Sequence, residues 1–272
     1  MTRSTRLRAT ALALALAAAL SACNDASPEQ LSASSPSPTP TAAPRVYTAP
    51  PACTLRLSAR RTVMLESAQA QRLTDALAHA TRDGLGERAT ERAAAAALPE
   101  LAADSRAVTR ALTRAAALTC TAQRDYSARA EKLTADGLTP RGVRLQRAMR
   151  TAFGPLPMGG FAAGGVSSGH VDNSAHYEGR AIDVFFTPRG AEQTRRGWLL
   201  AHWLVAHAEP LSLLSVIFSD HIWTVWAASA GWRDYVHPSG NTTNPVLRHL
   251  DHVHTAVVGP PRRQPTAPPA RS

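Results

Sequence analysis

The chain has 272 residues, of which 44% are hydrophobic, and a formal net charge of +10. This length suits one or two domains with additional tails, and the apolar fraction is sufficient for a hydrophobic core. The basic residues are scattered and form no stacking platform, so the charge does not indicate a nucleic-acid-binding protein. An exported protein with this charge would also be drawn to anionic lipid headgroups and anionic wall polymers.

The N-terminus has the organisation of an export signal. Arg3, Arg6 and Arg8 precede an Ala/Leu run of signal-peptide length, which is too short to span a bilayer. Leu20-Ser21-Ala22-Cys23 then resembles the lipobox of bacterial lipoproteins. The resemblance implies a signal peptide over 1–22, lipidation of Cys23, and anchoring to the outer face of the cell membrane. The alternative is an ordinary cleaved secretion signal with a chance cysteine.

Two cysteines remain after Cys23, namely Cys53 and Cys120. An even pair in an oxidising compartment favours a disulfide over two unrelated buried thiols. The segment 23–52 is rich in Ser, Pro and Thr and is expected to be a disordered tether, and the tail 260–272 has a similar composition.

The segment 53–135 is predicted to be a small all-helical domain. Leu73, Ala76, Leu77 and Ala80 have the spacing of one helix face. A second helix is expected from Glu87 to Leu98, ending before Pro99. Apolar residues from Leu101 to Leu133, in steps of four and three, predict a longer helix that Cys120 ties back to Cys53.

The segment 136–259 mixes helices and strands without a regular βαβ repeat. This order predicts an α+β domain with a mainly antiparallel sheet. The expected elements are a helix over 143–153, a loop over 154–169, a strand over 181–186, a helix over 195–208, two strands over 215–218 and 222–225, and a final strand over 253–258.

Histidines and an aspartate lie on these predicted strands. His252 and His254 share one face of the final strand, because alternate side chains point the same way. Asp183 lies within an apolar strand, where an unpaired carboxylate costs on the order of several kcal/mol. Gly179 leaves room for close backbone approach, so that His176 can face the same point. Imidazole and carboxylate groups are the usual ligands of zinc.

These residues also carry a family resemblance. Ser174-x-His176-x-x-Gly179-x-Ala181-x-Asp183, followed by His252-x-His254, resembles the signature of the hedgehog/D-Ala-D-Ala metallopeptidase fold. Zinc peptidases of this fold cleave bacterial cell-wall peptides. The likeness covers about 138–258 and extends to a group of secreted actinobacterial proteins that carry this domain at the C-terminus. It implies a zinc peptidase that acts on peptidoglycan stem peptides or cross-links, and the separate lipobox resemblance places this peptidase outside the cytoplasm, anchored to the membrane.

By position, the resemblance implies that His176, Asp183 and His254 are ligands of Zn²⁺. Three protein ligands leave a fourth place for water, which is the pattern of a catalytic site. A base must then take the proton of the water and deliver it to the leaving amine. His249 matches the base position of one branch of the family, with His252 as a helper at the developing oxyanion. Asp251 stands where another branch has a catalytic glutamate, and it either acts there or orients an imidazole.

Substrate contacts are the open part of this interpretation. The family's carboxypeptidases commonly bind the substrate carboxylate with an arginine, for which Arg180 and Arg248 are candidates, with Arg150 as a third. Trp223 is a candidate for a substrate groove, although a core position is the alternative. Carboxypeptidase and endopeptidase activity both remain open, as does a non-catalytic module that binds the cell wall. The other histidines, including His170 and His202, are interpreted as surface or core residues.

Overall fold

The computed structural model of the chain describes residues 52–123 and 127–260. The predicted signal peptide, Cys23 and the tether up to residue 51 lie outside these ranges, as does the tail after residue 260. All described residues fall within one compact unit. Within the described ranges, no helix has the length and apolarity that crossing a membrane requires.

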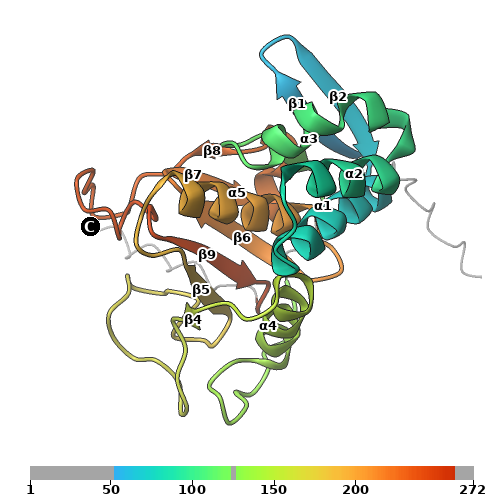
Figure 1. Cartoon of the computed structure of the whole chain (residues 1–272). Coiled ribbons are helices and arrows are strands. Elements are labelled where there is room, and N and C mark those ends of the chain that lie inside the picture. The colour runs from blue at the N-terminus through green and yellow to red at the C-terminus, as the bar shows by residue number, and fades with distance from the viewer. Residues whose placement is uncertain (1–51, 124–126, 261–272) are drawn as a thin grey trace, which may run out of the picture. The chain divides into compact units, whose positions relative to one another are not determined.

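The first half of the described chain combines a small sheet with helices (Figure 1). Its elements are β1 (Ala52–Ser58), β2 (Arg61–Glu66), α1 (Ser67–Arg82), α2 (Glu87–Ala97), the 3₁₀ helix η1 (Pro99–Asp104), α3 (Ser105–Leu112) and β3 (Leu118–Cys120). The helices predicted around Leu73–Ala80 and from Glu87 to Leu98 are confirmed as α1 and α2.

The prediction that this segment is all helical is wrong. Strands β1, β2 and β3 form a three-stranded sheet in the order β2-β1-β3, with antiparallel pairs. Burial in β1 alternates, with Cys53, Leu55 and Leu57 facing the core. This period of two is the pattern of a strand with one buried face. The pattern covers only the short segment of β1.

The long helix predicted from Leu101 to Leu133 is also wrong. Helix α3 ends at Leu112, and Ala116 has a φ of 50°, a left-handed conformation that reverses the chain. Residues 118–120 then pair with β1 as β3, so tertiary pairing overrides the helical spacing.

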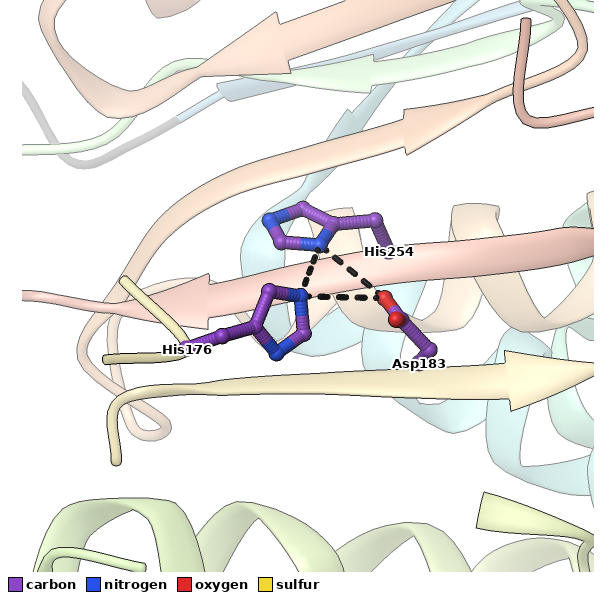
Figure 2. Close-up of side chains that lie close together, drawn as sticks. All are labelled: His176, Asp183 and His254. Carbon is purple, nitrogen blue, oxygen red and sulfur yellow. Dashed lines mark hydrogen bonds and ion pairs between the residues drawn. The ribbon is translucent and has the colours of Figure 1, made fainter. Parts of the chain in front are cut away.

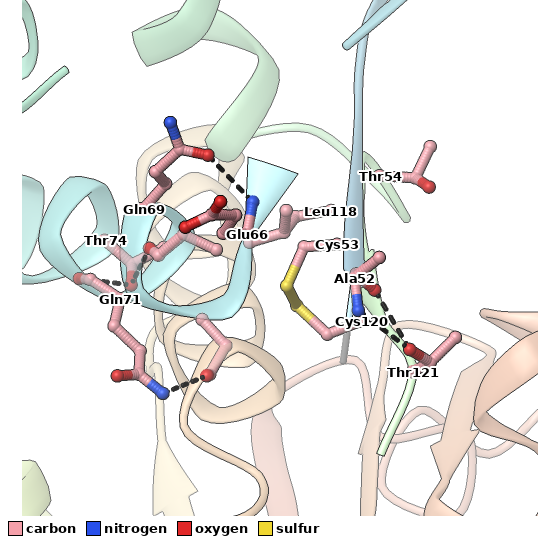
Figure 3. Close-up of a disulfide and its surroundings, with 12 residues drawn as sticks. Ala52, Cys53, Thr54, Glu66, Gln69, Gln71, Thr74, Leu118, Cys120 and Thr121 are labelled. Atoms are coloured by element: carbon pink, nitrogen blue, oxygen red, sulfur yellow. Dashed lines mark hydrogen bonds between the residues drawn. A yellow bond between two sulfur atoms is a disulfide. The ribbon is translucent and has the colours of Figure 1, made fainter. Parts of the chain in front are cut away.

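The predicted disulfide between Cys53 and Cys120 is confirmed, but Cys120 lies on a strand rather than on the predicted long helix, so the bond joins two strands. The two cysteines lie opposite each other in the register of β1 and β3 (Figure 3). Ala52 and Thr121 extend the pairing, because the amide of Thr121 donates to the carbonyl of Ala52 at 3.0 Å. A cross-link over 67 residues restricts the unfolded chain, which stabilises a fold by about 2–5 kcal/mol.

The second half of the described chain forms a larger sheet flanked by helices. Its elements are α4 (Pro140–Phe153), β4 (Met158–Gly159), β5 (Ala181–Phe185), α5 (Ala191–Ala206), β6 (Leu213–Phe218), β7 (His221–Thr224), η2 (Val225–Ala230), β8 (Arg233–Asp234) and β9 (His252–Val257). The predicted helices and strands of this half are confirmed with shifted ends, and the predicted loop over 154–169 contains the short strand β4.

The six-stranded sheet has the order β4-β5-β9-β6-β7-β8, and each neighbouring pair is antiparallel. This confirms the predicted α+β class with an antiparallel sheet. Helix α5 packs on β6 and β9, α4 contacts β5 and β9, and α1 packs against both helices (Figure 1). The helices of the first half therefore pack directly on the second half.

Strands β5 and β9 separate the core from the polar cluster. Ile182 and Val184 of β5, with Val253 and Val257 of β9, belong to the same hydrophobic cluster as the buried residues of α4 and α5. The alternate positions carry the aspartate and the histidines, which therefore face the other side of the sheet. Hydrophobic burial thus decides which side chains are available to a site.

His202 is a fully buried histidine that joins α5 to the end of α3. Its Nδ1–H donates to the carbonyl of Leu112 at 2.9 Å, and its Nε2 accepts from the amide of Ala117 at 3.1 Å. A neutral His202 ring with its proton on Nδ1 therefore makes a hydrogen bond at each of its two nitrogens. Burial lowers the pKa of His202 to about 4, and the bond to Leu112 opposes that shift.

This burial predicts an acid-sensitive fold. The unfolded chain takes up a proton at His202 near pH 6.5 and the folded chain only near pH 4, so stability falls as pH decreases between these values, by on the order of 3 kcal/mol. Urea unfolding at pH 7, 5.5 and 4 measures the effect. His202→Gln is expected to be less stable at pH 7 but to lose less stability on acidification. Equal pH slopes for the two proteins would contradict this assignment.

Candidate metal centre

The three predicted ligands converge on one point. His176, Asp183 and His254 each offer a ligand atom, and these atoms lie within 4.8 Å of one another. Nδ1 of His254 is 3.0 Å from Nε2 of His176 and 3.0 Å from Oδ1 of Asp183 (Figure 2). Nε2 of His176 is 3.4 Å from the same carboxylate oxygen. Together the three side chains form a group that can hold a metal ion.

The sheet register brings two of the three ligands together. Asp183 of β5 lies directly opposite His254 of β9 in the antiparallel ladder. His176 comes from the turn before β5, where the amide of Gly179 donates to the carbonyl of His176 at 3.0 Å. Gly179 has a φ of 62°, and a Cβ there would lie 2.4 Å from the carbonyl oxygen of Gly137. The turn therefore needs glycine, as the sequence predicts.

Gly160 orients the ring of His176, and sequence analysis does not single it out. The carbonyl oxygen of Gly160 lies 2.7 Å from Nδ1 of His176. Because a carbonyl only accepts, Nδ1 carries the proton, and Nε2 keeps its lone pair on the side of Asp183 and His254. A backbone carbonyl leaves no residue-type signal, but the Gly159-Gly160 pair marks a place of close approach.

The three candidate ligands are largely buried, and the carboxylate of Asp183 remains ionised. His176 is 2% exposed and Asp183 is 7% exposed. Burial raises the pKa of Asp183, but the contacts with the imidazoles of His176 and His254 outweigh it and hold the pKa well below its ordinary value. Burial lowers the pKa of His254. The site therefore presents a carboxylate and imidazole nitrogens, which is a suitable donor set for a divalent cation.

His249 lies beside the ligand group. Its ring centroid is 4.6 Å from that of His252 and 5.7 Å from that of His254. Its Nδ1 is buried and has no hydrogen-bond partner among the described residues. Burial lowers the pKa of His249 to about 2, and the neighbouring histidines add to the shift. A neutral ring with one unused nitrogen thus adjoins the candidate metal site.

Asp251 makes the orienting contact rather than reaching the centre itself. Its Oδ1 lies 2.8 Å from Nδ1 of His252. The other ring nitrogen of His252 lies 3.9 Å from Oδ1 of Asp183. His252 is therefore held between two carboxylates at the edge of the ligand group.

His170, interpreted from sequence as a surface or core residue, stacks on the ligand His176. The two ring centroids are 3.9 Å apart with an angle of 15° between the planes. The hydroxyl of Tyr177 holds the backbone of His170 at both polar groups, accepting from its amide at 2.9 Å and donating to its carbonyl at 2.6 Å. The loop before the motif is thereby fixed against the site.

Two of the predicted substrate contacts are wrong. Trp223 is fully buried, and its Nε1–H donates to the carbonyl of Cys120 at 3.3 Å, so it is a core residue and lines no groove. Arg180 is also buried, and its guanidinium donates to the carbonyl of Val257 at 2.7 Å and to the carboxylate of Glu178. It links β5 to the end of β9.

Arg248 lies beside a cavity of about 260 Å³. The cavity also contacts Asp220, Asp234 and Tyr235. The ring of Tyr235 stands edge-on to His249 with centroids 5.0 Å apart, so the cavity adjoins the candidate base. Its relation to a substrate stays a prediction.

One comparison with known proteins gives a match. Residues 134–246 are similar to the family described as VldE, C-terminal domain. This stretch is less than half of the chain. It includes His176 and Asp183 but ends before His249 and His254, and the similarity by itself indicates no reaction. Among curated proteins and among solved structures, no match was found.

The contact between Gly160 and His176 predicts the effect of a single methyl group on metal affinity. A Cβ at Gly160, where φ is 79°, would lie 2.4 Å from Cε1 and 2.5 Å from Nδ1 of His176. We expect Gly160→Ala to displace the ring and to weaken metal binding about tenfold to a hundredfold. Competition with a chromogenic chelator measures the dissociation constant.

Gly164→Ala is the matched control for that experiment. Gly164 lies in the same loop with a φ of 81°, but a Cβ there meets no atom within 4 Å. Both variants carry similar backbone strain, whereas only the first clashes with a ligand. Equal metal affinities in the two variants would show that Gly160 does not control His176.

Proposed function

We propose that the chain is a zinc metallopeptidase that cleaves peptidoglycan stem peptides or their cross-links. The observation that carries this proposal is the convergence of the ligand atoms of His176, Asp183 and His254 beside His249, whose Nδ1 has no hydrogen-bond partner among the described residues. The resemblance of the sequence signature to hedgehog/D-Ala-D-Ala peptidases supports the same reaction.

The spacing of the ligand atoms suits zinc. In a tetrahedral site with ligand distances of about 2.0–2.2 Å, neighbouring ligand atoms are about 3.3–3.6 Å apart. The separations among His176, Asp183 and His254 are 3.0, 3.0 and 3.4 Å. Zinc in such a site polarises a carbonyl group and lowers the pKa of water toward neutrality.

The surrounding residues supply the remaining chemistry. With a metal bound, His249 would take the proton of the attacking water and deliver it to the leaving amine. His252, oriented by Asp251 through its Nδ1, presents Nε2 toward the centre, and with a proton on Nε2 it would stabilise charge on the substrate oxygen. A base and an oxyanion helper thus approach from the same side of β9.

Substrate binding is assigned to the cavity next to His249. Arg248 lines this cavity together with Tyr235, and it can present its free N–H groups to a substrate carboxylate. The net charge of +10 favours attraction to anionic wall polymers. Placement at the cell envelope rests on the resemblance of the segment before Cys23 to a lipobox.

Two histidine substitutions separate metal binding from catalysis. We expect His254→Ala to lose zinc, and His249→Ala to keep zinc while losing at least about a hundredfold in turnover, because general base catalysis contributes about 10²–10⁴-fold. Metal analysis and incubation of zinc-loaded protein with purified muropeptides are the two measurements.

His79→Ala, on the exposed side of α1, is the matched control and is expected to retain both properties. Full turnover in His249→Ala would remove this residue from the mechanism. Zinc-loaded wild-type protein that binds muropeptides without cleaving them would identify a non-catalytic module that binds the cell wall.

The anchor can be tested independently of the reaction. Cys23→Ser removes the thiol that the lipidation requires. We expect the wild-type protein to sediment with membranes and the variant to appear in the soluble fraction of the envelope or in the medium. Fractionation followed by immunodetection measures this distribution, and an unchanged distribution would contradict lipidation at Cys23.

A further inference from the structure

The turn between β6 and β7 is bonded to the segment that carries His249. The amide of Ser219 donates to the carbonyl of His249 at 2.8 Å. The amide of Asp220 donates to the carbonyl of Arg248 at 3.1 Å. Residues 219–220 and 248–249 therefore form one joint, which is called the turn joint below.

The turn joint contains left-handed backbone at three residues that are not glycine. The φ angles are 49° at Ser219, 60° at Asp220 and 52° at His249. Each such residue costs about 1–2 kcal/mol relative to ordinary backbone. This conformation persists only where the surroundings over-determine it, so the contacts of the joint must fix the backbone of His249.

Asp220 makes most of those contacts. Its carboxylate accepts from Nε of Arg248 at 2.9 Å and from Nη2 at 2.6 Å, which is a bidentate pair. Its backbone carbonyl accepts from the amide of Tyr235 at 2.7 Å. Tyr235 in turn lies edge-on to the ring of His249. Asp220 thus holds both Arg248, which precedes His249 in the chain, and Tyr235, which packs against the His249 ring.

The ring of His249 contacts the backbone of Leu247, but its Nδ1 lacks a restraint of the kind that fixes a ligand histidine. Its Nδ1 has no hydrogen-bond partner among the described residues, although the side chain is only 9% exposed. A ligand histidine such as His176 is instead fixed by a bond to a carbonyl oxygen. The location of the His249 ring therefore depends on its backbone and on packing.

We propose that Asp220 is a positioning residue that sets the place of His249 through the turn joint. This proposal rests on the proposed function, because the proposed function assigns the role of base to His249. Asparagine at position 220 keeps the shape of the side chain but replaces one carboxylate oxygen with a donor group, so the bidentate pair with Arg248 is lost. Misplacement of a catalytic group by about 1 Å costs about a hundredfold in rate.

The test uses the zinc-loaded full chain and reads His249 directly. Long-range proton–nitrogen spectra report each histidine ring, and the signal that disappears in His249→Gln identifies this residue. In Asp220→Asn we expect the His249 signal to shift or split, the His202 signal to stay in place, and turnover of muropeptides to fall about tenfold to a hundredfold, with zinc content unchanged.

Glu192→Gln is the matched control. It breaks the exposed pair of Glu192 with Arg195 on α5, where the two residues are three positions apart. We expect this variant to leave both the His249 signal and turnover unchanged.

A second variant covers the case in which Asp220→Asn does not fold. Arg248→Lys keeps the charge but not the planar bidentate donor, so a smaller shift of the His249 signal is expected in the same direction. An unmoved His249 signal in the folded variants would overturn the proposal. If the wild-type protein cleaves nothing, the proposed function fails, while the His249 signal still decides whether Asp220 positions this residue.

Discussion

The pairing of β5 with β9 is the constraint on which the candidate site depends. In this ladder Asp183 lies opposite His254, while Ile182, Val184 and Val253 point into the hydrophobic core. Because side chains alternate, a slip of one residue in either strand would bury a charged or polar group in the core and move apolar groups to the site. Each buried unpaired carboxylate costs on the order of several kcal/mol, so the hydrophobic core specifies the register and thereby the distance between two ligands.

The remaining parts of the site come from irregular segments that the sheet supports. The turn before β5 delivers His176, the loop after β4 delivers the carbonyl of Gly160, and the turn joint delivers His249. These segments use left-handed backbone at Gly160 and Gly179, which glycine adopts readily, and at His249, where it is unfavourable in isolation. A rigid sheet with helices packed on it provides the stability that such conformations require. Strained backbone concentrated beside a polar cluster is typical of functional sites.

The sequence predicts the regular parts of this arrangement and misses the parts built from backbone. The same-face placement of His252 and His254, the buried strand around Asp183 and the Cys53–Cys120 pair all follow from residue type and periodicity. Strand β1 has only three alternating buried residues, directly after a Ser/Pro/Thr-rich segment, so its signal is weak. Tertiary pairing converts residues 118–120 from a helical pattern to a strand.

For the site, the sequence misses Gly160, His170 and Asp220, since a carbonyl contact, a ring stack and a turn joint depend on geometry that no residue spacing encodes. The opposite error occurs at Trp223 and Arg180, which have suitable chemistry but whose polar groups are bonded within the core.

The restraints on the histidines differ in a way that fits their proposed roles. His176 is fixed at Nδ1 by Gly160 and on its ring face by His170, which leaves Nε2 as its available atom. Such restraint suits a metal ligand, because an oriented donor loses little entropy on binding. His249 is fixed through its backbone and leaves Nδ1 without a partner. A base that must accept a proton and then release it requires such an unpaired atom, since a permanent hydrogen-bond partner would compete with both transfers. The division between locked ligands and an unpaired base therefore follows from where the hydrogen bonds are made.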